Sequence, residues 1–234
     1  KNIFIMETTQ NPSTEVPQPP KQAYESIEAT IAKMKLTFSN ALLPEIFAVM
    51  VTVGYTTEKI ELLKADLAQL EVLCQMQTKE AADKFEETDK FKLKKAEVDS
   101  IFSTHRGLLR ILFKGNIHAL KALRLDESMP RTYSAWFQMV SNFYSQLAET
   151  PDILTKATAV GVTEAKVAAQ RQAIAEVQSL KESQSKESAE AQAATDARDA
   201  AFDALYPQYT DYIKYAKILL AGNQVLEAIG VKVK

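Results

Sequence analysis

The run from Thr56 to Gly115 constrains the fold more than any other feature of this sequence. Gly107 is the only glycine or proline between these two residues. From Ile60 to Leu112, seam positions recur at alternating spacings of three and four residues without a phase break, apolar at both ends and small or polar in the middle. This spacing is typical of a helix that packs along a partner helix. The chain should therefore contain a very long helix.

The same pattern occurs a second time, 107 residues further along the chain. This offset brings the sparse prolines and glycines into register: Pro44 with Pro151, Gly54 with Gly161, and Gly115 with Gly222. Over positions 44–116 we count 18 identities in 73 pairs, where unrelated residues of ordinary composition would give about 5. We therefore predict a tandem duplication.

The duplication predicts one helical plan for both halves. A first helix spans about residues 22–42 and 132–148, and a short helix opened by proline follows at 44–53 and 151–160. Thr56 and Thr163 should cap the long runs, and a short helix closes each half. The sequence thus predicts three parts of the chain: an extended proline-rich arm at 1–21, a first helical repeat at 22–126 and a second helical repeat at 127–234.

Each long run could be one continuous helix or a hairpin turning near Lys79–Glu87 and Lys186–Ala194. Neither segment contains glycine, proline or asparagine, so a continuous helix is favoured. Pro207 should kink the second helix because it lacks a backbone N–H. The expected fold class is all-α: an elongated helical bundle with two long coiled-coil-like helices and no sheet.

Two copies of one unit tend to pack about a two-fold axis. The long helices should then run antiparallel and cross near Thr88 and Thr195, where the seam residues are small. The alanine-rich stretch Ser188 to Ala204 has two interpretations. It could reflect high helix propensity, or small residues could permit close approach between helices.

Composition excludes several classes of protein. A net charge of -2 argues against a basic nucleic-acid binder, and the single cysteine, Cys74, excludes an internal disulfide. The most apolar stretch, Leu42 to Val53, contains Pro44 and Glu45 and is shorter than a membrane span. We therefore expect a cytoplasmic protein with no membrane span and no nucleic-acid partner.

Motifs for catalysis are missing from the sequence. Neither His105 nor His118 follows a glutamate by three residues, as a ferritin-like di-iron site requires. We predict no enzymatic activity, no cofactor and no metal site, and we expect His105 to be a hydrogen-bonded core residue. The lysine-rich segment Lys90–Lys95 predicts a solvated face, with contact to an anionic surface as the alternative. Core or interface packing best explains two aromatic clusters: Tyr133, Trp136, Phe137, Phe143 and Tyr144, and Tyr206, Tyr209, Tyr212 and Tyr215.

The last third of the chain resembles an uncharacterised family of bacterial all-helical proteins. The resemblance depends on the stretch Ala194 to Ala201 (ATDARDAA), on the closing residues Leu226 to Val231, and on the helix that contains Trp136. It covers roughly residues 130–231. It implies an all-helical fold and no activity, so it supplies no functional residues.

A non-enzymatic, self-assembling structural protein is the function that these observations favour, with the chain itself as partner in a homo-oligomer or filament. A protein-binding adaptor and an α-helical membrane-active protein are the alternatives. The candidate self-association residues form an apolar tip on the proline-stiffened arm: Ile3, Phe4, Ile5 and Met6. The tip could instead fold back on its own subunit or lie outside the natural chain.

Overall fold

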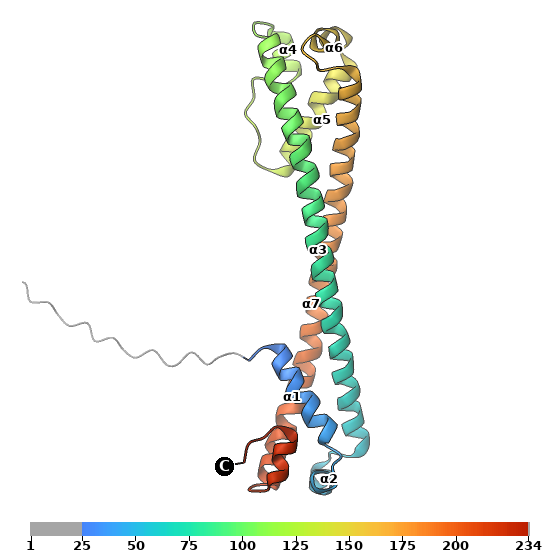
Figure 1. Ribbon diagram of the computed structural model, residues 1–234, viewed down its shortest axis with the longest axis vertical. Coiled ribbons are helices and arrows are strands. Elements are labelled where there is room, and N and C mark those ends of the chain that lie inside the picture. Colours follow the sequence, from blue (N-terminus) through green and yellow to red (C-terminus); the bar gives the residue numbers. More distant parts are fainter. Residues whose placement is uncertain (1–24, 234) are drawn as a thin grey trace, which may run out of the picture. The chain divides into compact units, whose positions relative to one another are not determined.

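The computed structural model describes residues 25–233, which are 83% helical and contain no strand. The predicted all-α class is thus confirmed for this part of the chain. The helices, in order, are α1 (Ile27–Asn40), α2 (Pro44–Met50), η1 (Val51–Val53), α3 (Thr57–Leu112), α4 (Ile117–Ala122), α5 (Tyr133–Glu149), α6 (Pro151–Thr158), α7 (Glu164–Leu219) and η2 (Gln224–Ile229) (Figure 1).

Both long runs are single continuous helices, as predicted. Helices α3 and α7 contain 56 residues each, which corresponds to about 84 Å at about 1.5 Å per residue. The predicted caps are present, because the hydroxyls of Thr56 and Thr163 accept hydrogen bonds from the backbone N–H groups of Lys59 and Lys166. Helix α7 continues through Pro207, and the kink there stays a prediction.

Glycines end the short helices that precede α3 and α7. Gly54 has a φ of 88° and Gly161 a φ of 82°, in the left-handed region that glycine adopts without steric cost. The N–H of the next residue bonds back across the turn, from Tyr55 to the carbonyl of Met50 and from Val162 to that of Ala157. These turns set the direction in which each long helix leaves.

Contacts divide the chain into two compact units, and the boundaries fall within both long helices. One unit consists, in its described part, of residues 25–60 and 215–233, and the other of residues 61–214. The predicted repeats at 22–126 and 127–234 concern sequence similarity, so this division by contacts leaves them untested.

The smaller unit joins α1 to the C-terminal segment. Met34 and Phe38 of α1 are fully buried, and the Thr37 hydroxyl donates a 3.1 Å hydrogen bond to the carbonyl of Ile229. The Asn40 amide donates a 2.7 Å bond to the carbonyl of Ala228. These side-chain bonds satisfy carbonyls in the last turn of η2.

The larger unit has its main core where α5 lies beside α3 and α7 (Figure 1). Phe102 of α3 and Phe143 of α5 meet edge to face with ring centroids 5.1 Å apart, a favoured aromatic geometry. Trp136 donates its indole N–H to Asp99 at 2.7 Å. Arg106 and Arg110 of α3 donate to backbone carbonyls of the segment before α5 and so attach that segment to the core.

Side-chain burial along the long helices is uneven. Leu70 and Phe91 of α3 are buried, but no side chain between them, in the described segment from residue 71 to residue 90, is buried. Between Val177 and Leu205, α7 buries only Ala191. Five of the eight alanines in the 188–204 stretch are exposed and only Ala191 is buried, which favours helix propensity over close approach for the exposed ones.

Replacement of Phe102 by alanine should destabilise the protein by about 3–5 kcal/mol, because it removes a fully buried ring from a packed core. Phe85 on the same helix is 71% exposed, so Phe85→Ala should change stability by less than about 0.5 kcal/mol. Urea unfolding followed by far-ultraviolet circular dichroism measures both. Equal losses in the two variants would contradict the described burial.

Candidate functional site at the centre of the helix pair

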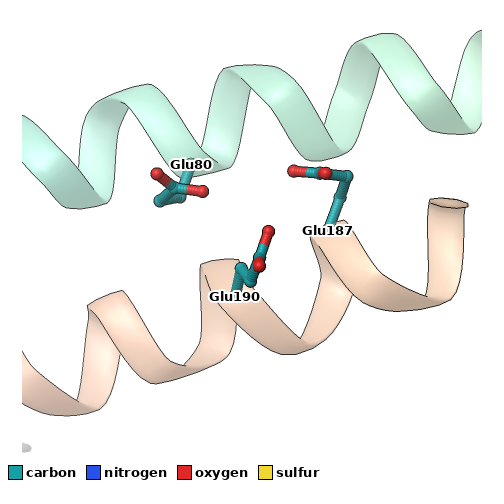
Figure 2. A group of neighbouring side chains, drawn as sticks. All are labelled: Glu80, Glu187 and Glu190. Atoms are coloured by element: carbon teal, nitrogen blue, oxygen red, sulfur yellow. The ribbon is translucent and has the colours of Figure 1, made fainter.

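Three contacts fix the antiparallel register of α3 and α7 in the larger unit. Lys94 forms a 2.9 Å ion pair with Glu176, and Gln184 donates a 3.5 Å hydrogen bond to the Thr88 hydroxyl. Further along, Glu80 lies opposite Glu187 and Glu190 (Figure 2). Residue numbers therefore fall along α7 as they rise along α3, as predicted.

The predicted crossing at Thr88 and Thr195 is wrong. Thr88 contacts Gln184, and Thr195 lies eleven residues further along α7, about 16 Å away at about 1.5 Å per residue. The residues that face each other and also match at the 107-residue offset are Glu80 and Glu187. The small seam residues misled the prediction because side-chain size says nothing about where two helices meet along their length.

Carboxylates from both helices converge at this centre. Oxygens of Glu80, Glu187 and Glu190 all lie within 4.8 Å of one another, and Glu187 and Glu190 project from α7 toward Glu80 on α3 (Figure 2). No motif in the sequence predicted this cluster, because the carboxylates are scattered along the chain. The one signal was the match of Lys79-Glu80 with Lys186-Glu187 across the repeats.

Two lysines neutralise part of this negative charge. Lys79 pairs with Glu80 at 3.2 Å and with Asp83 at 3.0 Å. Lys186 pairs with Glu187 at 3.6 Å and Glu190 at 3.3 Å. Hydrogen bonds to Asp83 and Glu80 raise the pKa of Lys79, and the bond to Glu190 is the main cause that raises the pKa of Lys186. Both lysines are about 70% exposed, so these pairs add little stability.

An open groove of about 550 Å³ runs beside the carboxylates. One end is charged, and the other has an apolar lining formed by Leu73, Met76, Ala193, Ala194 and Ala197. Carboxylate oxygens are the ligands that hard divalent cations prefer, so Glu80, Glu187 and Glu190 are the residues here that could hold one. Exposed acidic groups of this kind are common without a bound ion.

His105 is a buried, hydrogen-bonded core residue, as predicted. It is 5% exposed, and its Nδ1 lies 2.9 Å from the hydroxyl of Tyr144 on α5. Burial is the main cause that lowers the pKa of His105, and the charge of Lys166 lowers it further. Burial also raises the pKa of Tyr144, so both groups are neutral near pH 7 and one of them donates the hydrogen bond to the other.

The lysine-rich segment forms a solvated, ion-paired face, which agrees with the preferred interpretation. Lys90 pairs with Glu86 at 2.7 Å and Glu87 at 2.8 Å, and Leu93 is 73% exposed. Lys95 differs, since its ammonium lies 4.2 Å from the centroid of the Trp136 ring. In the first aromatic cluster, Trp136, Phe143 and Tyr144 are buried in the core.

The apolar tip Ile3, Phe4, Ile5 and Met6 lies outside the described residues. No described helix is by itself both long and apolar enough to cross a membrane. Together, Ile27–Asn40 and Pro44–Val53 meet that length and composition, with a bend of 92° between them.

Comparisons with models of protein families, with curated proteins and with solved structures found no match. The resemblance to a bacterial all-helical family stays a prediction.

Thiol cross-linking tests the register of α3 and α7. In a Cys74→Ser background, Thr88→Cys with Gln184→Cys should be joined within one chain by a short bismaleimide, because these side chains are in contact. Thr88→Cys with Thr195→Cys should not be cross-linked to each other, because about 16 Å separates Thr195 from the contact point. Peptide mass spectrometry identifies the linked pair, and the reverse pattern would contradict the described register.

The pH dependence of stability should follow His105. Its folded-state pKa lies below the ordinary histidine value of 6.5, so the unfolded chain binds the proton more tightly. The contribution to stability is therefore present above pH 6.5 and is lost as pH falls from there through the folded pKa. His105→Gln should flatten the fall in unfolding free energy between about pH 7 and about pH 5. His118→Gln is the matched control, since His118 is exposed on α4, and it should keep the wild-type profile.

Proposed function

We propose that this chain is a non-enzymatic structural protein that assembles with copies of itself through the middle of the α3–α7 pair. One observation carries the proposal. Over residues 71–90 no side chain of α3 is buried, yet three large apolar side chains are exposed there: Val72 at 47%, Met76 at 49% and Phe85 at 71%.

Two helices alone cannot bury the middle of this pair. Its seam contains Gln77, Ala81 and Thr88 in α3, which are half-buried. Packing against a further helix would remove the exposed apolar side chains from water, at about 1.5–3 kcal/mol for each one fully buried. In a two-fold dimer both copies bury these side chains, so the gain is doubled. It can then offset the several kcal/mol of free energy that association costs in lost translational and rotational freedom.

The alternative partner is a different protein that docks on the same surface, which would make the chain an adaptor. A membrane-active protein is the second alternative, and the apolar pair Ile27–Asn40 and Pro44–Val53 is the observation that favours it. The arm tip, Ile3 to Met6, stays a proposed second contact between copies.

We also propose that the chain arose by tandem duplication. Several correspondences at the same 107-residue offset support this. The bounds of α3 and α7 differ by 107 at both ends, and so do the glycines of positive φ at 54 and 161 and at 115 and 222. The ion pairs of Lys79 repeat at Lys186 with the same spacings. The direct test is a related protein that contains a single copy of the repeat. Its structure should be a dimer in which two long helices pair in the antiparallel register of α3 and α7.

Self-association is tested by light scattering coupled to size-exclusion chromatography. The full chain should exceed the mass of one subunit, and Met76→Gln with Phe85→Gln should weaken association at least tenfold, because each change removes an apolar contact worth about 1.5–3 kcal/mol. Ile111→Gln is the matched control: Ile111 is 77% exposed on the same helix but lies outside the middle segment, and its variant should assemble normally.

Deletion of residues 1–21 forms the second arm of this experiment and should lower the oligomeric state if the tip contributes. A full chain that is monomeric at every concentration would exclude self-assembly and favour the adaptor.

A further inference from the structure

A second pocket in the larger unit lies between α3 and the start of α5, away from the centre of the helix pair. Its volume is about 460 Å³, within the range of small-molecule sites. The lining combines flat or apolar side chains with charged ones: Phe91, Met129, Pro130, Tyr133 and Trp136 with Lys95, Asp99 and Arg131, together with Ser103 and Thr132.

The positive charges of this pocket lack carboxylate partners. Neither Lys95 nor Arg131 forms an ion pair within the described residues, whereas Lys90 and Lys94 on α3 do. The Lys95 ammonium is held 4.2 Å from the Trp136 ring centroid instead, a cation–π contact that fixes its position. Two cations at one pocket thus remain available to an anion.

Asp99 is the only carboxylate among the described residues that line the pocket. Asp99 accepts the indole N–H of Trp136 at 2.7 Å, which fixes the ring against α3. A third cation adjoins the wall, since the Lys181 ammonium lies 5.2 Å from the Phe91 ring centroid and 5.8 Å from that of Tyr133. The charged lining residues, Lys95, Arg131 and Asp99, give the pocket a net charge of +1. Lys181 and Glu182 add one charge of each sign next to Tyr133.

Cationic guests are disfavoured here despite the aromatic side chains. The chain's own lysines occupy the faces of Trp136 and Phe91, and they would repel a second cation. An anion gains attraction to Lys95 and to Arg131, whose planar guanidinium binds carboxylate or phosphate through two parallel hydrogen bonds. A flat apolar body would pack on the half-buried Tyr133 and the exposed Met129.

We propose that this pocket binds a small organic anion, a carboxylate or phosphate attached to a flat apolar body. Lys95 and Arg131 hold the anionic group, and Tyr133 with Met129 contacts the body. Asp99 positions Trp136 and limits affinity through its own negative charge.

Trp136 is the only tryptophan of the chain, so its fluorescence reports on this pocket alone. The full-length protein is titrated with benzoate, phenyl phosphate and benzamide, which present the same ring with a carboxylate, a phosphate or a neutral amide. Benzoate or phenyl phosphate should change the emission saturably, and benzamide should bind at least tenfold more weakly. The tighter of the two anions identifies the preferred group.

Variants assign the binding to the named residues. Lys95→Met and Arg131→Gln should each weaken anion binding at least fivefold, whereas Asp99→Asn, which keeps an acceptor for the indole N–H, should tighten it. The matched controls are Lys92→Met on α3 and Arg171→Gln on α7, both exposed and outside the pocket. Arg131 lies on an exposed segment before α5, so its variant should keep the wild-type thermal unfolding midpoint.

Three results would overturn the proposal: no saturable response to either anion, equal affinity for benzamide and benzoate, or equal weakening by the control variants. Failure of self-assembly would leave this test unaffected, because the fluorescence titration reads binding to a single chain.

Discussion

The antiparallel contact between α3 and α7 is the interaction on which the larger unit depends. It places residues more than ninety positions apart in the sequence side by side, as Thr88 and Gln184 are. Because the register is fixed at Lys94–Glu176 as well, the carboxylates of Glu80 and Glu187 must face each other. The same contact supplies two of the helices that enclose the core under α5, so its loss would expose both regions together.

Polar residues take two different roles along the seam of this helix pair. Near α5 two of them have partners: the buried His105 lies beside the Tyr144 hydroxyl, and the half-buried Lys181 places its ammonium over aromatic rings. In the middle, Gln77 and Thr88 stay half-exposed. A buried polar group without a partner costs about 1–3 kcal/mol, which favours polar seam residues where α5 offers a partner or where water reaches them. Gln170 of α7 is the exception, since it is buried and its side-chain oxygen accepts no hydrogen bond from the described residues. This distribution leaves the middle as the least covered part of the pair.

The proposed self-assembly and the proposed anion pocket draw on different surfaces of the larger unit. The first depends on exposed apolar side chains of α3, such as Phe85, which the other described residues leave uncovered. The second depends on charge, since Lys95 and Arg131 meet at a pocket without an ion-pair partner. Apolar association has little directional preference, whereas an anion site is selective for charge and shape. The two activities can therefore be separated by substitution.

The sequence by itself determined the helical class, the continuity of α3 and α7 and the threonine caps. These are local properties: the heptad spacing, the lack of glycine and proline, and the cap hydroxyls act within a few residues. It also indicated that His105 belongs to the core, because His105 falls on the heptad seam of its helix. The tertiary structure alone decided the register, so that Thr88 meets Gln184 rather than Thr195, and it brought together Glu80, Glu187 and Glu190. It also placed Lys95 over Trp136. Register between two helices depends on the sum of contacts along both, and no single residue or spacing in the sequence encodes that sum.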